Sequence, residues 1–355
     1  MYSDMEPSKT RQFLHKVLQS MGRSAEIFMA KRRWVKLIGF LLAAFFLSIV
    51  GLLISRDVQN TRPKIPVVYQ SYLSMISPEE ITDLSIDWKN GDVEIFVQDD
   101  NDQIVIREFS ELRLNRKRRM QILNQDGRLE LIWNNDGFWW RLFGKSVKDL
   151  RIELPRSMVE QLVTVECENY VGDMKLRELQ LQETNLKTVY GNLSFEDSRS
   201  EHFTAYTKTG DIRMSSLDSN TLILETSTGD IEGKDTITAN AMMESDLGNI
   251  LVSGILSEGV EMKTISGNIQ VFAAQCPMNM VLKSVRGEVN VKLPPEVHAD
   301  GILLNYSSVF GHIDLMYPVH PKEKQRGEIQ TGAQKHHLTI TTTAGAILVH
   351  DLETE

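Results

Sequence analysis

A series of acidic and amide side chains at a fixed spacing is the feature of this sequence that best fits metal binding. Each member follows a glycine, and the series runs Asp173, Asn192, Asp211, Asp230, Asn249, Asn268 and Glu288. Stacked Asp turns bind calcium in nonapeptide β-rolls, where the glycines are much closer together than the one in nineteen residues found here. Asp and Asn also complete ordinary turns. We therefore predict a structural role for the series, with no metal site and no cofactor.

A pair of glutamates could supply the two carboxylates of a glycan-cleaving enzyme. Glu225 and Glu244 occupy equivalent positions nineteen residues apart. At the same position in other repeats the neighbours carry opposite charges, as in Glu168 with Lys187 and Glu244 with Lys263. Such a pattern is typical of ion pairs between strands on a solvated face. Mixed surface charge is the favoured interpretation, and we predict no catalytic residues.

The histidines and cysteines do not form a recognisable site. The histidines that could bind a metal are His202, His298, His312, His320, His336 and His337. Zinc needs three or four converging ligands, and these residues are scattered. Two cysteines, Cys167 and Cys276, lie too many repeats apart to form a disulfide within the chain.

An aromatic cluster is the first candidate interaction site. Residues 136–143 read DGFWWRLF, with Phe138, Trp139 and Trp140 adjacent. Such a cluster could insert into a membrane interface, stack on sugars, or cover an open end of the fold. Covering an end is the favoured interpretation, because an uncovered end of a repeat protein aggregates.

A run of basic residues is the second candidate. Residues 113–119 read RLNRKRR, and the cations are Arg113, Arg116, Lys117, Arg118 and Arg119. Outside a cell, the partners that suit such a run are anionic lipid headgroups or teichoic-acid-like polymers. A solvated hairpin is an equal alternative. The net charge of the chain, -9, gives no reason to expect a nucleic acid as partner.

The elements that position these residues belong to an internal repeat. Glycines recur in five successive steps of nineteen, at Gly172, Gly191, Gly210, Gly229, Gly248 and Gly267. Gly287, Gly311 and Gly345 follow at longer intervals, each before a polar or small residue and an aliphatic one. Glycine followed by Asp or Asn is a turn signal. A period of this length indicates stacked supersecondary units.

Strict alternation on both sides of each glycine predicts two short strands per repeat. After the glycine, the buried column includes Ile212, Ile231, Ile250 and Ile269. Before it, two columns are expected to point inward. They are Cys167, Leu186, Ala205, Leu224, Met243 and Met262, and then Asn169, Thr188, Thr207, Thr226, Ser245 and Thr264. One such unit cannot bury its own apolar face, so the units must stack as an all-β solenoid with 19-residue turns.

The N-terminal region predicts a membrane anchor. Residues 37–54 are uncharged and apolar apart from Ser48, and they are long enough for a single transmembrane helix. Basic residues are denser before this segment than after it, which places residues 1–36 in the cytoplasm and the rest outside. The tail of residues 1–36 has apolar residues at helical spacing that favour a short amphipathic helix. Residues 55–74 are expected to be a linker.

The two ends of the solenoid are expected to be irregular. Residues 75–155 are rich in strand patterns without the clean period, and we assign them to the first turns. Residues 156–350 hold the regular repeats. An insertion around residues 298–337 precedes a closing turn, LTITTTAGAILV.

The periodic set resembles a known family. ITDLSIDWKNGDVEIFV, KDLRIELP, the repeated T-x-x-G-[DN]-I turns and TITTTAGAI look like the toastrack, or putative-adhesin, β-strand repeat family. The resemblance covers about residues 75–350 and implies an extracytoplasmic β-solenoid of the kind found on Gram-positive surfaces, including Lia-type envelope-stress proteins. It brings no catalytic residues with it.

Taken together, these features predict a single-pass cell-membrane protein with its C-terminal domain outside the cell. We expect a non-enzymatic scaffold, adhesion or stress-sensing protein, with an anionic envelope polymer or another envelope protein as partner. The alternative is an enzyme that acts on cell-wall glycans from a solenoid scaffold.

Overall fold

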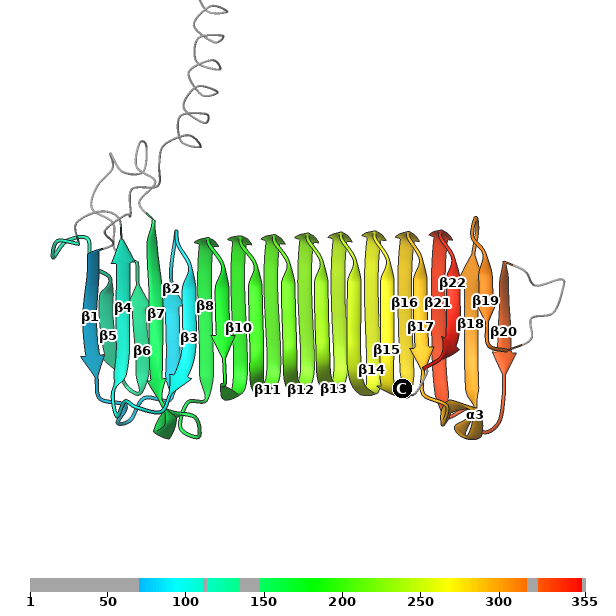
Figure 1. Ribbon diagram of the computed structural model, residues 1–355, viewed down its shortest axis with the longest axis horizontal. Coiled ribbons are helices and arrows are strands. Elements are labelled where there is room, and N and C mark those ends of the chain that lie inside the picture. Colours follow the sequence, from blue (N-terminus) through cyan, green and yellow to red (C-terminus); the bar gives the residue numbers. More distant parts are fainter. Residues whose placement is uncertain (1–69, 111–113, 134–146, 318–324, 353–355) are drawn as a thin grey trace, which may run out of the picture. The chain divides into compact units, whose positions relative to one another are not determined.

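The computed structural model describes residues 70–110, 114–133, 147–317 and 325–352, and they form one elongated β-solenoid (Figure 1). In the described part, no helix is both long and apolar enough to cross a bilayer. The predicted cytoplasmic tail, the membrane span of residues 37–54 and most of the linker lie outside the described residues.

Each repeat forms one rung of the stack, a rung being a turn of the chain that contributes a strand to each of two facing sheets. The central rungs are four long strands that bend halfway: β11 (Leu193–Thr209), β12 (Ile212–Thr228), β13 (Ile231–Leu247) and β14 (Ile250–Ser266). Neighbouring rungs pair in parallel, with Ile212 opposite Ile231 and Ile231 opposite Ile250. The 19-residue period therefore equals one full rung, as the sequence predicted.

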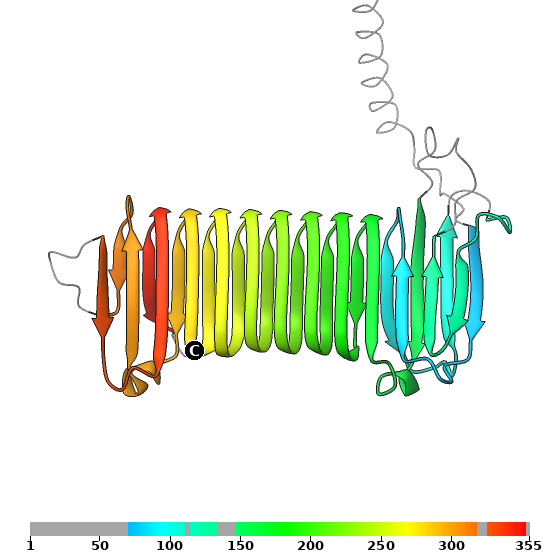
Figure 2. The same cartoon turned by 180° about the vertical axis from the view of Figure 1, so that it is seen from behind.

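Two shorter sets of strands flank the centre. On the N-terminal side are β8 (Thr164–Val171), β9 (Met174–Arg177) and β10 (Gln180–Tyr190). On the C-terminal side are β15 (Ile269–Gln275), β16 (Asn279–Arg286) and β17 (Val289–Leu293). Figure 2 shows the same two-layered stack from behind.

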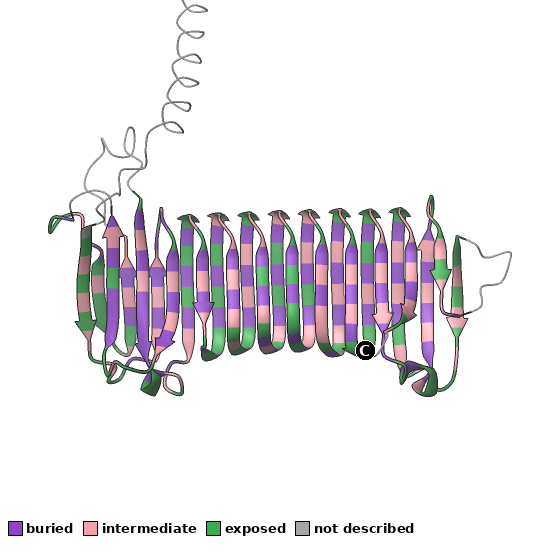
Figure 3. Cartoon of the chain, viewed as in Figure 1, coloured by how far each residue is buried: buried purple, intermediate pink, exposed green. Residues whose placement is uncertain are grey.

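The core runs without a break between the two sheets (Figure 3). The predicted isoleucine column is confirmed: Ile212, Ile231, Ile250 and Ile269 are all 0% exposed. Both columns predicted before the glycine are buried as well, with every member at most 5% exposed. Alternation along each strand thus places one side chain in the core and the next on an outer face.

One edge of each rung is a tight corner made by glycine and the residue after it. At Gly229, φ is +151°, and an added Cβ would lie 2.0 Å from the carbonyl oxygen of Gly210 in the rung before. Glycine is needed here because the backbones approach too closely for any side chain. We call this edge of the solenoid the corner edge.

The opposite edge is a wide bend that the sequence did not predict. The chain turns there without leaving its strand pairing, through residues with positive φ at 19-residue intervals. These residues are Glu178, Asp197, Ser216 and Asp235.

The N-terminal end is assembled out of chain order. Its strands are β1 (Gln70–Ile76), β2 (Asp83–Asp87), β3 (Val93–Gln98), β4 (Ile104–Ser110), β5 (Gln121–Gln125), β6 (Arg128–Ile132) and β7 (Lys148–Pro155), followed by the 3-10 helix η1 (Arg156–Met158). Strands β2 and β3 form a rung that lies between the β6–β7 rung and the β8–β9 rung. Antiparallel β5, β4 and β1 then close this end.

The C-terminal end uses the same arrangement. Its elements are the short helix α3 (Val297–Asp300) and strands β18 (Ile302–Ser308), β19 (Ile313–Leu315), β20 (Arg326–Gln330), β21 (His336–Ala344) and β22 (Ile347–Asp351). The rung that is last in the sequence, β21–β22, lies between β16–β17 and β18–β19. The segment around residues 298–337 therefore contains the outermost rung, and antiparallel β20 lies beyond it.

Candidate functional site

The acidic and amide series forms a hydrogen-bonded ladder along the corner edge. In each rung, a side-chain oxygen accepts a hydrogen bond from the backbone N–H of the equivalent residue in the next rung. The Asn192 N–H lies 2.7 Å from Asp173 Oδ1, and the Asp230 N–H lies 2.9 Å from Asp211 Oδ1. In the described ranges, no three His, Cys, Asp or Glu side chains are grouped to hold a metal ion. The hydrogen bonds show that these oxygens act as acceptors within the corner turns.

The ladder continues into the irregular N-terminal rungs, where carboxylates follow one another. Asp92 accepts from the Asp173 N–H at 2.9 Å, and Asp149 accepts from the Asp92 N–H at 3.0 Å. Burial and repulsion from Asp149 and Asp173 raise the pKa of Asp92, although the hydrogen bond from Asp173 opposes this. The Asp92 carboxylate is therefore repelled by two neighbouring carboxylates in this part of the corner edge.

A second ladder of hydroxyls lies just inside the corner edge. Thr226 Oγ1 donates to the Gly210 carbonyl at 2.9 Å, and Ser245 Oγ donates to the Gly229 carbonyl at 2.9 Å. The hydroxyl in each case lies three residues before its own corner glycine. The predicted hydroxyl column therefore holds the close glycine backbones of adjacent rungs together.

The glutamate pair that could have served an enzyme lies on the outer face of the first sheet, the sheet of the strands that end at the corner glycines. Glu225 is exposed and lies opposite Glu244 in the next rung. The Glu168–Lys187 ion pair between rungs is present at 3.7 Å. Lys263 lies beside Glu244 in register, but its ammonium group is 2.8 Å from Glu261 of its own strand.

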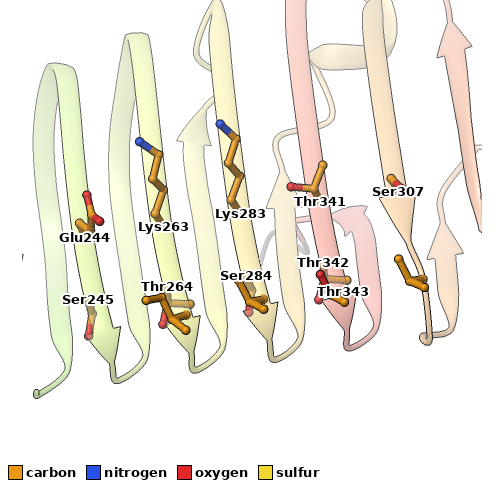
Figure 4. Close-up of a pocket in the computed structure, with 13 residues that line it drawn as sticks. Glu244, Ser245, Lys263, Thr264, Lys283, Ser284, Ser307, Thr341, Thr342 and Thr343 are labelled. Atoms are coloured by element: carbon orange, nitrogen blue, oxygen red, sulfur yellow. The ribbon is translucent and has the colours of Figure 1, made fainter. Parts of the chain in front are cut away.

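A shallow groove of about 450 Å³ begins at Glu244 and runs toward the C-terminal end (Figure 4). Lys263 and Lys283 line it (Figure 4). Three apolar residues that each stand two positions before a corner glycine also line it: Ile265, Val285 and Val309. Glu244 lines this groove and Glu225 does not.

The described members of the basic run have different surroundings. Arg116 and Lys117 are exposed at the tip of a turn whose backbone is held by Asn115. Arg119 stacks over the Tyr72 ring at 4.2 Å, and the Arg118 carbonyl accepts a hydrogen bond from Lys148. Arg113 lies outside the described residues. Among the described members of the run, Arg116 and Lys117 are thus the best placed to meet a partner.

The aromatic residues Phe138, Trp139 and Trp140 lie outside the described residues, so the prediction about them stays a prediction. The described N-terminal end contains a different cluster. Trp88 and Trp133 meet edge to face at 5.0 Å, and Lys148 lies 4.3 Å from the Trp133 ring centre.

Lys148 occupies the place that a corner glycine holds in later rungs, and its side chain is buried against Glu108. The ammonium–carboxylate distance is 2.5 Å, and the two side chains are 2% and 0% exposed. Burial lowers the pKa of Lys148, while Glu108 opposes that effect. Sequence periodicity could not identify this pair, because it joins residues forty positions apart in the irregular part.

Two of the described histidines lie beside carboxylates, and both cysteines are buried. His298 lies 2.8 Å from Asp351, and His336 lies 3.7 Å from Asp300. Both Cys167 and Cys276 are buried free thiols. Burial raises the pKa of Cys276 to about 12, and it raises that of Cys167 further.

Comparison with solved structures finds proteins of low identity. A protein of Parabacteroides distasonis described as a putative adhesin is 11% identical, with 80% of this chain and 97% of that chain covered and a TM-score of 0.48. A putative adhesin of Bacteroides fragilis is 12% identical, with 80% of this chain and 97% of that chain covered and a TM-score of 0.40.

No curated protein matches the chain. One family model does match, and it spans residues 81–350, from the first buried core residue, Ile81, into the last strand of the sequence. That range includes every rung described above. The chain belongs to the Toastrack DUF4097 family.

Proposed function

We propose that this protein is a membrane-anchored, extracytoplasmic scaffold that presents a rigid solenoid surface to a partner in the cell envelope, in adhesion or stress sensing. The observation that carries the proposal is that polar side chains of the solenoid are engaged in hydrogen bonds and ion pairs within the fold. The carboxylates and amides of the corner edge bond the next rung, and charged residues of the outer faces pair with one another. Such a surface suits binding rather than catalysis, which needs groups held free for the substrate.

Family membership agrees with this reading, because the resemblance that the sequence carries is to surface proteins. The uncharged segment of residues 37–54 supports an anchor, and the density of basic residues before it supports an outward-facing solenoid.

The topology can be tested by adding protease to intact cells. A chain anchored as proposed should release a fragment that contains most residues after about position 60, while a tag at the N-terminus stays protected. Full protection of the solenoid would overturn the proposed location.

We propose an anionic envelope polymer as the partner, and the exposed turn at Arg116 and Lys117 as its contact. Long-range attraction between these cations and a polyanion should weaken as salt is added, because the charges are solvated. Charge reversal at both positions (R116E with K117E) should reduce retention of the chain on teichoic-acid-type polymer.

The matched control reverses two exposed lysines of the central rungs, Lys208 and Lys234. Equal loss of binding in both double variants would mean that net charge alone matters. Binding of a purified envelope protein in place of the polymer, with the Arg116–Lys117 variant unaffected, would assign the partner to another class.

A further inference from the structure

Exposed apolar side chains are concentrated on the corner edge. Over the described residues, seventeen large hydrophobic side chains are exposed, and nine of them occupy the two positions that precede a corner residue. The nine are Val147, Tyr170, Val171, Tyr190, Leu247, Ile265, Val285, Val309 and Phe310. Two positions in a repeat of nineteen thus hold about half of the exposed apolar groups, which a randomly varied surface would not produce.

The apolar groups lie in two stretches of this edge. Tyr170 and Tyr190, in adjacent rungs, meet edge to face at 6.0 Å and are 54% and 46% exposed. Toward the C-terminal end, Ile265, Val285 and Val309 also line the groove, and neighbouring Phe310 is 77% exposed. Exposed apolar patches of this kind mark contact surfaces.

The chain also enters the solenoid at the corner edge. Gln70, the first residue of β1, pairs with Ser110 of β4, and Ser110 pairs with Lys148 of β7. Lys148 is stacked on Gly91 in the row of corner glycines, since a Cβ added to Gly91 would meet the carbonyl oxygen of Lys148. Fifteen residues, 55–69, separate Gln70 from the predicted membrane span. At roughly 3.3–3.6 Å per residue, they reach no more than about 50 Å.

We propose that the corner edge lies on the outer surface of the membrane, with its two apolar stretches in the bilayer interface. This inference rests on the proposed membrane anchor and adds an orientation to it. Tyrosine and phenylalanine side chains suit the interface, where the ring is in an apolar layer and the tyrosine hydroxyl stays hydrated.

Charge on this edge argues that the contact is apolar rather than electrostatic. The ladder beside the apolar positions is acidic at Asp92, Asp173, Asp211 and Asp230. Anionic headgroups would be repelled by these carboxylates, so the contact should form on zwitterionic lipid and persist at high salt.

The experiment measures immersion in the full chain reconstituted into phosphatidylcholine vesicles. A spin label is placed at F310C or I265C on the corner edge, and its relaxation by oxygen, which is lipid-soluble, is compared with relaxation by a water-soluble nickel chelate. The controls are M242C on the outer face and I237C at the wide bend, which are 42% and 45% exposed. The parent chain, treated with the same label, gives the background signal from its two buried native cysteines.

The corner-edge labels should be relaxed more strongly by oxygen than by the nickel chelate, while both control labels stay accessible to nickel. High salt should change neither result. If all four labels are equally accessible to nickel, the proposed orientation is wrong, and this result by itself does not test the anchor. Carbonate extraction separates the two failures, because a chain that leaves the vesicles in carbonate lacks the anchor itself. Immersion of the Met242 label in place of the Phe310 label would assign the contact to the outer face.

Discussion

At the scale of single residues, the core depends on side chains such as Ile250, which is 0% exposed and stacked between Ile231 and Ile269. Replacing Ile250 with Asp would bury an unpaired charge, and we expect a loss of at least about 3 kcal/mol of unfolding free energy. Ile237→Asp is the control, because Ile237 is 45% exposed and should tolerate the charge. Denaturant unfolding of the two variants measures the difference, and equal midpoints would show that the assigned register is wrong.

The corner glycines are expected to be as sensitive as the core. Gly229→Ala would bring a Cβ within 2.0 Å of the Gly210 carbonyl oxygen at a φ of +151°, so adjacent rungs must separate. We expect a loss of at least about 3 kcal/mol. At Gly259 an added Cβ would meet only the side-chain oxygen of Asn240, at 3.0 Å, so Gly259→Ala should change stability by less than about 1 kcal/mol. Thermal unfolding of both variants tests this, and a stable Gly229→Ala protein would contradict the close approach.

Asp92 should make stability depend on pH. Its pKa is raised above the ordinary value of 3.8, so the folded state binds this proton more tightly than the unfolded state does. The contribution of this group to stability is therefore favourable at low pH and is lost as pH rises through the raised pKa.

Asp92→Asn keeps the side-chain oxygen that accepts from the Asp173 N–H and removes the repulsion. At neutral pH this variant should be more stable by less than about 1 kcal/mol, because the group is partly solvated. The gain should vanish at a pH where Asp92 of the parent is protonated. An equal gain at every pH would attribute the effect to something other than the charge.

At the scale of the elements, whole rungs should be interchangeable. Excising Leu193–Asp211 removes nineteen residues and joins Asn192 to Ile212, which preserves the corner and the register. It also removes Phe195 and Phe203 together, and these two rings pack against each other at 4.4 Å. We expect a folded, cooperative protein because each rung contacts only its neighbours.

Excising Leu193–Gly210 instead removes eighteen residues and one corner glycine. The shift by one residue turns the apolar side of a strand toward solvent, so this variant should fail to fold or should aggregate. Circular dichroism and size-exclusion chromatography compare the two proteins. Identical behaviour would contradict a rung of nineteen residues.

How far the sequence predicts these elements depends on what repeats. The corner edge was predictable because glycine and Asp or Asn recur there with little variation. The wide bend was missed because its positive-φ positions hold Glu178, Asp197, Ser216 and Asp235, and no single residue type marks them. The contacts of Arg119 with Tyr72 and of Lys148 with Glu108 join distant, non-periodic segments, which no pattern along one sequence can identify.

At the scale of the whole molecule, the order of rungs at both ends differs from the order in the chain. Periodicity suggests stacking in sequence order, so it could not predict that β2–β3 and β21–β22 are second from the last rung at their ends. Each of these rungs is covered on both sides, which keeps the ends of the family domain away from the open ends of the stack.

Removal of residues 335–355 should therefore damage more than the last turn of the sequence. The β16–β17 and β18–β19 rungs would both lose the neighbour that lies between them. We expect amides of residues 279–317 to lose hydrogen-exchange protection, while those of residues 183–247 keep it. Protection retained throughout residues 279–317 would contradict the interleaved order.

The place where the chain enters the solenoid also determines how the molecule would carry a mechanical load. Strand β1 starts at the corner edge and runs antiparallel to β4 over its whole length, from the Gln70–Ser110 pair to the Ile76–Ile104 pair. A pull on Gln70 away from that edge acts along β1, at right angles to its hydrogen bonds with β4. All the bonds of this strand are then strained in shear at the same moment and do not open one after another. A protein tethered through β1 would resist tension on its tether while its rungs remained stacked.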